Sequence, residues 1–553
     1  MSEEISVGDL VAEFLQACGT TTAFGVVSVH NIPMLDAIGR RNAIRFVMAR
    51  GEAGAGHMAD AYARVSGRLG ALFSSTGPGA ANTCGALVEA RFAGTPLLHL
   101  TGQTATGNVD RGQGTVHDVT DQLGMLRSVS KAAFRIRSAE TALGVLTKAA
   151  VAALTPPMGP VSVEVPIDIQ RARIPRPATL DGFVLPLPPP AAPAAASLNA
   201  LADMVAAAKR PLLWTGNGAR LAGRAVRRLL DLGIPHVTSW AGRGVVPEDH
   251  PLTLGGLNAA SEVVEFYRGV DLLIVAGARL RGHETADMSL ALPARRVQID
   301  VDPEADGRTY SSELFVCGEA GPALDGLADR LKGRLDLDPG YAAEVADLKR
   351  RATEGYLAFL GPYGRFPEII RAALPKDAVW VRDITLNHTT WGNRLFTLYG
   401  PRDSIYPVGA AIGPGMQLGI GAALGAPGRK VVAMCGDGGF MLDLGEVWTA
   451  VQERADVVFL VMNDRGYGVI KHIQDKMYGG RHYFADPPGP DLEKLAVLAG
   501  LPFQRVSAVD ALGPAVARAV AVDGPALVEV DMHAIGDFPP YFAPPPYAAK
   551  AKA

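Results

Sequence analysis

The sequence predicts an α/β fold made of three doubly wound domains, each built on a parallel sheet. Short runs rich in Val, Ile and Leu alternate with helical patterns through most of the chain, as in strands that helices cover on both faces. The length of 553 residues exceeds what one hydrophobic core fills and predicts about three domains. A proline-rich stretch separates the first block of such elements from the second.

The composition is that of a globular chain, with 48% hydrophobic residues and a net charge of −3. It shows neither the strong basic field of a nucleic-acid binder nor an acidic tail. The start, MSEEISVGDLV, carries acids where a secretory signal needs basic residues, and no apolar run reaches about 18 residues. We therefore expect a cytoplasmic protein that binds neither nucleic acid nor membrane. Four cysteines without metal-type spacing are interpreted as buried thiols: Cys18, Cys84, Cys317 and Cys435.

The first block covers residues 1–175 and opens with a predicted helix. Apolar residues recur at helical spacing from Val7 to Cys18, and Gly19 stands where a helix C-cap is expected. Three strand-like runs follow, at Leu72–Ser75, Leu97–Thr101 and Val161–Val165. This succession is typical of a parallel sheet with helical crossovers.

Residues 176–195 are predicted to form a linker. The stretch IPRPATLDGFVLPLPPPAAP contains seven prolines and little periodicity, which favours a semi-extended segment. The second block, residues 196–335, contains the strand-like runs PLLWTG, DLLIVAGA and RRVQIDVDP and predicts a smaller doubly wound domain. The third block, residues 355–535, contains AVWVRDI, KVVAMCGDGG, ADVVFLVMND and PALVEVDM, and a Pro-rich tail of residues 536–553 closes the chain.

One carboxylate lies between glycines in the stretch MCGDGGFM, directly after a predicted buried strand. Val431–Cys435 reads as this strand, a helical pattern follows, and Val457–Met462 reads as a second buried strand. Asp437 follows the first strand and Asn463 follows the second. Because neighbouring strands lie about 5 Å apart, both side-chain oxygens would reach one small hard cation.

Magnesium suits this arrangement because it takes few protein oxygens and completes its octahedron with water and phosphate. The glycines at positions 436, 438 and 439 would let the backbone approach phosphates closely, and the next helix would offer its positive N-terminus. The alternative is a tight glycine turn with a solvated Asp, which is common in α/β proteins. The succession of strand, helix, strand and terminal Asn favours the metal site.

The pair GDGG and NDRGYG, separated by a helix and a strand, resembles the diphosphate–magnesium motif of thiamine-diphosphate enzymes. The interval from Asp437 to Asn463 is 26 residues. The resemblance implies that Asp437 and Asn463 give side-chain ligands to Mg²⁺ and that Arg465 gives its backbone carbonyl. It also implies cofactor contacts for Gly436, Asp437, Gly438, Gly439, Asn463, Tyr467 and Gly468.

Enzymes of this family activate the cofactor with a glutamate from the N-terminal domain of the opposite subunit. The segment FVMARGEAGAGHMADAYAR resembles the family's form around this residue, from Arg50 to Arg64, and Glu52 would begin an alanine-rich helix. Burial raises the pKa of such a carboxyl, so that it can share a proton with a ring nitrogen of the cofactor. The alternative is an ordinary acid at a helix N-terminus, favoured by the dipole.

Two further segments extend the resemblance. SSTGPGAANT, residues 74–83 with Pro78, is similar to the glycine-rich turn that lines the pyrimidine pocket. In GPGMQLGIGAALGA, Gly415 precedes Met416, which aligns with the apolar residue that holds the cofactor bent. Pro414 departs from the glycine usual there, although its carbonyl can still accept a hydrogen bond.

Asn387 and His388 resemble a Gln-His pair on the diphosphate, if an insertion is allowed before them. The resemblance covers nearly the whole chain, in the order pyrimidine-binding, central and diphosphate-binding domain. It points to the acetolactate synthase-like group, which includes 2-oxoacid decarboxylases, benzaldehyde lyase-type carboligases and 2-hydroxyacyl-CoA lyases.

Two histidines are candidates for acid–base chemistry. In FGVVSVHNIP, His30 stands where benzaldehyde lyase-type enzymes and some decarboxylases place a histidine. In RGQGTVHDVTDQLGM, His117 stands where many relatives carry glutamine. An imidazole with a pKa near neutrality can pass a proton to a substrate or guide an acceptor aldehyde. Each also fits an ordinary hydrogen-bonded histidine near a loop.

The central domain of acetolactate synthases binds FAD through segments similar to GMHG and FGxRFDDR. The matching stretches here, GGLNAAS and AGARLRGHETADM, keep a Gly277-Ala278-Arg279 turn but lack the acids and the GMHG segment. We therefore expect FAD to be absent or vestigial. This departure also argues against true acetolactate synthase activity.

The resemblance implies a thiamine-diphosphate- and Mg²⁺-dependent enzyme that cleaves or joins C–C bonds at a 2-oxo acid or 2-hydroxy carbonyl compound. One alternative is an enzyme of the 2-hydroxyacyl-CoA lyase or oxalyl-CoA decarboxylase type. Four arginines would then contact the phosphates of CoA: Arg279, Arg281, Arg295 and Arg296. A second alternative is a non-catalytic cofactor-binding relative, although binding alone does not require Glu52. Because Glu52 would meet Asp437 across a subunit boundary, we expect a homodimer at least, and a homotetramer as in many relatives.

Overall fold

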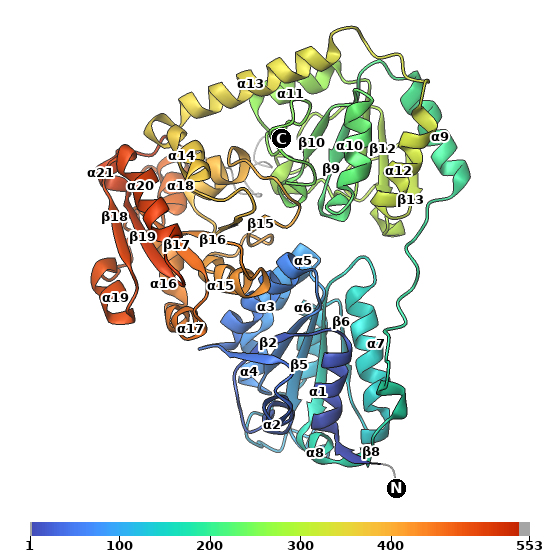
Figure 1. The fold of residues 1–553 in the computed structure, drawn as a ribbon, viewed down its shortest axis with the longest axis vertical. Helices are drawn as coiled ribbons and strands as arrows, with labels where there is room; N and C mark the ends of the chain where they lie inside the picture. Colours follow the sequence, from blue (N-terminus) through green and yellow to red (C-terminus); the bar gives the residue numbers. More distant parts are fainter. Residues whose placement is uncertain (1–2, 541–553) are drawn as a thin grey trace.

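A computed structural model describes residues 3–540 and contains three parallel sheets (Figure 1). The first and third sheets have six strands each, and the sheet between them has five. The predicted α/β class with three doubly wound domains is therefore confirmed. Strands β1 (Glu4–Ser6) and β8 (Arg173–Pro175) form a separate antiparallel pair that fastens the start of the first domain to its end.

The first domain begins with helix α1, whose N-cap Ser6 accepts a hydrogen bond from the backbone N–H of Asp9. Its strands are β2 (Thr22–Gly25), β3 (Arg45–Met48), β4 (Gly70–Ser74), β5 (Leu97–Gln103), β6 (Ala132–Arg135) and β7 (Pro160–Pro166). Its helices are α1 (Val7–Ala17), α2 (Ile32–Arg41), α3 (Glu52–Ser66), α4 (Pro78–Asn82), α5 (Cys84–Ala93), α6 (Gln122–Val129), α7 (Ala142–Leu154) and α8 (Ile167–Arg171). Gly19, just past α1, has a φ of 78° that favours glycine, as expected of the predicted helix end.

The central domain follows a stretch from 183 to 194 that forms neither helix nor strand. Its strands are β9 (Pro211–Thr215), β10 (His236–Thr238), β11 (Leu272–Ala276), β12 (Arg296–Asp300) and β13 (Leu314–Cys317), in the order β10-β9-β11-β12-β13. Its helices are α9 (Ala195–Ala207), α10 (Gly223–Asp231), α11 (Ser261–Phe266) and α12 (Ala320–Leu331). The prediction of four buried thiols is confirmed for Cys435 alone. Cys18 and Cys84 are only partly buried, and Cys317 is exposed because it ends the edge strand β13.

Helix α13 (Tyr341–Phe359) runs from the central domain to the third domain along the top of the molecule in Figure 1. The strands of the third domain are β14 (Val379–Arg382), β15 (Ser404–Ile405), β16 (Val431–Gly436), β17 (Val457–Asn463), β18 (Phe503–Val506) and β19 (Ala526–Asp531). Its helices are α14 (Phe366–Ala372), α15 (Gly415–Gly425), α16 (Asp437–Leu442), α17 (Glu446–Glu453), α18 (Gly468–Met477), α19 (Leu492–Ala499), α20 (Val509–Val520) and α21 (Met532–Ile535). Most of the predicted Pro-rich tail, residues 541–553, lies outside the described residues.

The first and third sheets share one strand order. The strands lie in the order β3-β2-β4-β5-β7-β6 in the first sheet and β15-β14-β16-β17-β19-β18 in the third. Numbered within each domain, both orders read 2-1-3-4-6-5. The turns after β2 and β4, and likewise those after β14 and β16, therefore flank the point where the strand order reverses. Ligands of open α/β sheets bind beyond the carboxyl ends of the strands at such a point.

Helices α3 and α15 pack against each other and join the first domain to the third (Figure 1). Met58 and Tyr62 of α3 share one buried apolar cluster with Leu418 of α15. The helices approach closely because α15 has glycine where it crosses α3. A Cβ at Gly421 would collide with the carbonyl oxygen of Met58, and one at Gly425 would lie 2.9 Å from that of Tyr62. The two domains therefore share part of one core.

We expect Gly421→Ala to lower the free energy of unfolding by at least about 1–3 kcal/mol, because the added methyl meets backbone that cannot move aside easily. Gly39→Ala is the matched control: Gly39 is also inside a helix, α2, and no atom lies within 4 Å of the added Cβ. The control should keep or gain up to about 1 kcal/mol of stability. Urea unfolding followed by circular dichroism measures both variants. Equal losses in the two would contradict the close packing of α3 on α15.

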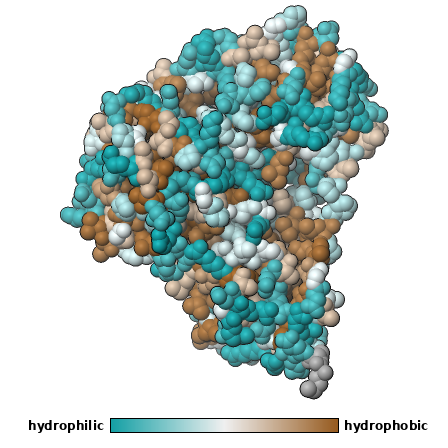
Figure 2. Space-filling model, in the orientation of Figure 1, coloured by the Kyte–Doolittle hydropathy of each residue, from teal (hydrophilic) through white to brown (hydrophobic). Residues whose placement is uncertain are grey.

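The surface seen in Figure 2 mixes hydrophilic and hydrophobic side chains over all three domains. Within residues 3–540, no helix has the length and apolar character needed to cross a membrane.

Candidate functional site

Asp437 and Asn463 lie at adjacent strand ends in the third domain. Strand β16 pairs in parallel with β17, with Gly436 opposite Met462. Asp437 begins α16, and its carboxylate accepts hydrogen bonds from the backbone N–H groups of Asp464 (3.3 Å) and Gly466 (2.9 Å). The side chain of Asp437 is therefore held against the turn that starts at Asn463.

The amide of Asn463 is held in one orientation by Glu529 of β19. Asn463 Nδ2 donates to Glu529 Oε1 at 2.7 Å, and the other carboxylate oxygen of Glu529 accepts from Arg505 Nε at 2.9 Å. The amide oxygen therefore faces the turn, where it accepts from the backbone N–H of Arg465 at 3.1 Å. Sequence reasoning missed Glu529, because it lies 66 residues further along the chain.

The oxygens of this turn have the chemistry that a divalent cation requires. Burial and the charge of Asp437 raise the pKa of Asp464, because two carboxylates meet there with Lys471 as the cation that offsets them. Arg465 has a φ of 55°, and its carbonyl oxygen lies 3.3 Å from Lys471 Nζ. One carboxylate, one amide oxygen and one carbonyl form a ligand set that Mg²⁺ accepts. The residues predicted to bind Mg²⁺ therefore fit a hard cation.

Glycines 438 and 439 allow neighbouring side chains to lie directly on the turn after β16. A Cβ at Gly438 would lie 2.6 Å from Tyr467 Cε1, so the Tyr467 ring rests on this backbone. A Cβ at Gly439 would collide with Asp383 Oδ2. Side chains that the sequence separates widely therefore converge on the predicted diphosphate turn.

Asp383, which follows β14, links this turn to the start of α15. Its two oxygens lie 3.1 and 3.0 Å from the backbone nitrogen of Gly413, which donates to them, and Oδ1 also accepts from the N–H of Ile384 at 2.8 Å. A Cβ at Gly415 would lie 2.5 Å from Asp383 Cβ, and Met416 follows fully buried. Burial raises the pKa of Asp383 from 3.8 to about 7. The sequence marked Asp383 as a strand end but assigned it no role.

We expect Asp383→Asn to change how stability depends on pH. Between the ordinary pKa of 3.8 and the raised value of about 7, the folded protein holds a proton that the unfolded chain has lost. The free energy of unfolding therefore falls as pH rises through this window, and Asp383→Asn removes that fall. The free energy of unfolding of the variant minus that of the parent should therefore increase as the pH rises from about 5 to about 7.5, as measured by urea unfolding without cofactor. A stability difference between parent and Asp383→Asn that stays constant over this pH range would refute the ionisation argument.

The side chains of Asn387 and His388 point into the protein. Asn387 Oδ1 accepts from Trp391 Nε1 at 2.8 Å, and Asn387 Nδ2 faces Met532 Sδ at 3.5 Å. His388 is buried, and its ring lies 5.5 Å from the Tyr406 ring between centroids. In this conformation the Asn387 amide has partners on both atoms, and within residues 3–540 no hydrogen bond of either residue reaches the turn after β16.

Contacts from this segment to the turns come from Thr385 and Leu386 instead. Thr385 Cγ2 lies 3.1 Å from a Cβ built at Gly436, and Leu386 Cδ1 lies 2.8 Å from one built at Gly468. The contacts of this segment with the two turns thus lie on the strand side of Asn387 and His388. Sequence reasoning could have weighed Thr385, since it lies nearer the end of β14.

A second cluster of predicted residues lies at the carboxyl edge of the first sheet. Glu52 begins α3 and is half-buried, and its Oε2 accepts from Asn82 Nδ2 at 3.1 Å. Gly79 lies between Glu52 and Ser75, since a Cβ there would be 2.7 Å from Glu52 Oε1 and 2.6 Å from Ser75 Cβ. Glu52 and the turn that contains Pro78 therefore form one continuous surface.

His30 and His117 lie together beside that turn. Their ring centroids are 5.1 Å apart, and His117 Nδ1 lies 3.3 Å from Ser75 Oγ. Burial, and then the proximity of His117, lower the pKa of His30, which favours its neutral form. His30 Nδ1 is buried and has no hydrogen-bond partner within residues 3–540. Two histidines 87 positions apart in the sequence thus form one pair.

The third domain holds the N-terminus of α3, where Glu52 begins the helix. Glu446 Oε1 accepts hydrogen bonds from the backbone N–H groups of Arg50 (2.9 Å) and Gly51 (3.1 Å). Glu446 is buried at the start of α17, so the backbone next to Glu52 depends on a residue 396 positions away. Within one chain, the hydrogen bonds of the Glu52 side chain stay in the first domain and those of Asp437 stay in the third.

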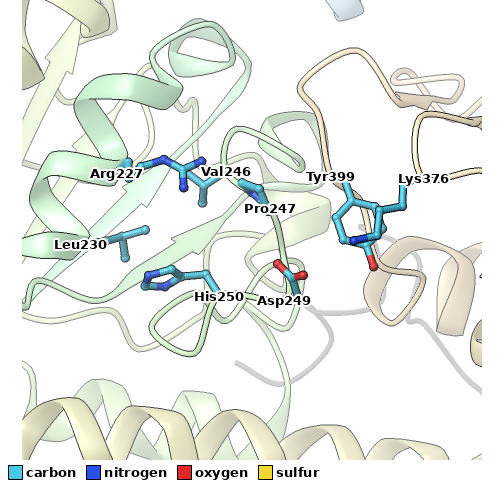
Figure 3. Close-up of a pocket in the computed structure, with 8 residues that line it drawn as sticks. All are labelled: Arg227, Leu230, Val246, Pro247, Asp249, His250, Lys376 and Tyr399. Carbon is cyan, nitrogen blue, oxygen red and sulfur yellow. The ribbon is translucent and has the colours of Figure 1, made fainter.

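The cavity drawn in Figure 3 lies between the central and third domains and has a volume of about 280 Å³. Arg227 and His250 line it from the central domain, and Lys376 and Tyr399 face them from the third domain. A second cavity of about 470 Å³ shares Lys376 and Tyr399. None of the predicted site residues lines either cavity.

Models of three domain families match this chain in order. "Thiamine pyrophosphate enzyme, N-terminal TPP binding domain" matches residues 5–125, "Thiamine pyrophosphate enzyme, central domain" matches 198–327, and "Thiamine pyrophosphate enzyme, C-terminal TPP binding domain" matches 386–530. The first match contains both histidines and Glu52, and the last contains the turns after β16 and β17.

Whole proteins with this architecture are similar over most of the chain. The probable 2-ketoarginine decarboxylase AruI of Pseudomonas aeruginosa is 31% identical over 478 residues, which is 86% of this chain and 84% of that protein. The probable chloroplastic acetolactate synthase 2 of Oryza sativa subsp. japonica is 30% identical over 559 residues, 94% and 82%. The acetolactate synthase isozyme 1 large subunit of Escherichia coli K12 is 27% identical over 538 residues, 95% and 94%. The chain therefore belongs to the thiamine pyrophosphate enzymes with N-terminal, central and C-terminal domains, and it is homologous to acetolactate synthases and to 2-ketoarginine decarboxylase.

Proposed function

We propose that this member of the acetolactate synthase and decarboxylase family cleaves or joins C–C bonds at a 2-oxo acid or 2-hydroxy carbonyl compound, in the form of decarboxylation of a 2-oxo acid with optional carboligation. The observation that carries the proposal is the surface formed by Glu52, the Ser75–Gly79 turn and the His30–His117 pair. After a C–C bond is cleaved, a proton must reach the product carbon, and a pair of imidazoles can donate and accept one near neutral pH.

Thiamine diphosphate, when bound, supplies the electron sink for the bond that is cleaved. We propose that Asp437, Asn463 and the carbonyl of Arg465 hold a Mg²⁺ ion for its diphosphate. The orientation that Glu529 imposes on Asn463 supports this role, because outer partners commonly orient metal ligands. The proposed part of Glu52 is to exchange a proton with the pyrimidine ring, since its carboxylate lies at the edge of the first sheet.

We also propose that the active unit is a homodimer in which the first-domain cluster of one protomer faces the third-domain turns of its partner. Apolar side chains that are 44–69% exposed surround both halves. Those near the histidines are Val27, Val29, Ile32 and Val116, and those of the third domain are Ile412, Leu442 and Ile470. Exposed apolar groups gathered at two predicted half-sites support an interface there. A homotetramer would be two such dimers.

Three of the four arginines offered for a CoA substrate have other partners. Arg281 donates to the carbonyl oxygens of Phe92 (2.7 Å) and Val408 (3.2 Å). Arg295 pairs with Glu313, and Arg296 donates to the carbonyl of Ser311. These contacts favour free acids over CoA thioesters as substrates.

The test is incubation with thiamine diphosphate, Mg²⁺ and a substrate panel, followed by mass analysis of the products. The panel contains pyruvate, benzoylformate, longer 2-oxo acids, 2-ketoarginine and 2-hydroxyacyl-CoAs. We expect decarboxylation of at least one free 2-oxo acid, and ligated products when an aldehyde is added. Turnover of thioesters alone would overturn the proposal in favour of the CoA-dependent alternative.

A further inference from the structure

Two serines connect the loops that carry His30 and His117. Ser28 Oγ accepts from the backbone N–H of His30 at 3.1 Å and donates to Ser75 Oγ at 2.7 Å. Ser75 Oγ in turn lies 3.3 Å from His117 Nδ1. One chain of hydrogen bonds therefore runs from the loop after β2, across the turn after β4, to the loop that carries His117.

Both serines are held firmly by their surroundings. Ser75 is 4% exposed, and its carbonyl accepts from Thr101 Oγ1 at 2.7 Å. The N–H of Ser28 donates to Asn31 Oδ1 at 2.8 Å, and Asn31 Nδ2 donates to the carbonyl of Val26 at 2.9 Å. Because Asn31 is fully buried, the loop that presents Ser28 and His30 has a defined shape.

This chain of hydroxyl groups favours one nitrogen of His117 as the site of its proton. A serine hydroxyl has one proton to donate. Ser28 donates its proton to Ser75, which leaves the proton of Ser75 for another acceptor, and His117 Nδ1 lies within hydrogen-bond distance of Ser75 Oγ at 3.3 Å. Since Nδ1 then acts as an acceptor, neutral His117 carries its proton on Nε2. His30 differs, because its Nδ1 has no such partner within residues 3–540.

We propose that Ser28 and Ser75 are positioning residues that hold His117 in the Nε2–H tautomer, so that this imidazole always presents an N–H donor beside His30. The catalytic consequence rests on the proposed function, whereas the tautomer is a property of this chain alone. With ring centroids 5.1 Å apart, two imidazolium ions would repel each other, so a neutral ring with a defined tautomer is the useful state of the pair.

The direct test is ¹⁵N NMR of the full-length protein labelled with ¹⁵N-histidine, in which long-range couplings report the tautomer of each ring. The His117 signal is identified by its loss in His117→Gln. We expect neutral His117 to be the Nε2–H form in the parent and a mixture in Ser75→Ala. Ser28→Ala should give a smaller shift, and Ser28→Thr should restore the parent pattern. An Nδ1–H form in the parent, or an unchanged tautomer in Ser75→Ala, would overturn the inference.

Ser74→Ala is the matched control. Ser74 is the adjacent serine, at the end of β4, and is also buried, but its hydroxyl bonds to His99 Nε2 at 2.8 Å and to the carbonyl of Ser75. Its loss should lower stability without changing the tautomer of His117. If Ser74→Ala changed that tautomer as much as Ser75→Ala does, a loosened turn would explain the effect and the inference would fail.

Steady-state kinetics with the substrate identified from the panel measure whether the tautomer of His117 affects catalysis. We expect Ser75→Ala to lower kcat about tenfold, the scale of a lost buried hydrogen bond, with little change in KM and an altered pH profile. If no substrate were turned over, the proposed function would fail while the NMR result still decided the tautomer. Suppose that Ser75→Ala changes the tautomer of His117 but keeps a normal kcat and pH profile. The tautomer would then not serve catalysis, and the proposed catalytic consequence would be overturned.

Discussion

Asp437→Asn should lose most of its Mg²⁺-dependent affinity for thiamine diphosphate. The variant keeps one acceptor oxygen for one of the two backbone N–H groups, of Asp464 and Gly466, that now bond to separate carboxylate oxygens, so the turn is expected to remain folded with one hydrogen bond fewer. It removes the one negative charge among the three proposed ligand groups. Loss of an outer partner of a metal ligand typically costs about 10–100-fold in affinity, so loss of a charged ligand should cost at least about 100-fold.

Isothermal titration of the variant with cofactor, at fixed Mg²⁺, measures this loss. Glu529→Gln provides a graded comparison, because it removes the charge behind Asn463 and leaves an amide near it. We expect about a tenfold loss there. Both variants should unfold at nearly the parent temperature without cofactor. Parent-like affinity in Asp437→Asn would remove the metal site from the proposal.

Glu52→Gln should bind thiamine diphosphate normally but turn over at least about 100-fold more slowly, the usual scale for lost acid–base catalysis. A glutamine side chain can accept the hydrogen bond from Asn82, so the start of α3 keeps its contacts. It cannot take up or release a proton, which is the role proposed for the carboxyl. Cofactor titration and steady-state rates on the substrate from the panel measure the two effects separately.

Asn82→Ala is the comparison for this experiment. It removes a hydrogen bond to Glu52 Oε2 but leaves the carboxyl itself. We expect a loss of about tenfold or less, the range for one hydrogen bond. Near-normal turnover by Glu52→Gln, or an equal loss in both variants, would show that Glu52 has a structural task only.

The sequence predicts best where chemistry follows directly from strand geometry. Asp437 and Asn463 each follow a run of buried-strand residues, and parallel neighbours end at the same edge of a sheet. Glu52 starts α3, as the alanine-rich pattern after a strand predicts. The sequence did not predict that the first and third sheets share one strand order. It showed only that the first and third blocks are similar in length and in their alternation of strand-like and helical patterns.

Partners that lie far along the chain were not predictable. Glu446 holds the start of α3 from 396 positions away, and Glu529 orients Asn463 from β19, two strands later in the sequence. Periodicity predicts which face of an element is buried, but not which side chain it meets. Asn387 shows a different limit. The turn that follows it contains Thr390 at φ −101° and ψ −106°, outside the helical region, so alignment by sequence could not predict where these side chains point.

The contact between α3 and α15 has a consequence for how the protein is made. About 350 residues separate the end of α3 from the start of α15. At roughly 5–20 residues per second, the ribosome needs tens of seconds to deliver α15 after α3 has emerged. During that time α15 is not yet available to pack on the face of α3 that carries Met58. The nascent chain therefore exposes an apolar surface that chaperones can bind until α15 has been synthesised.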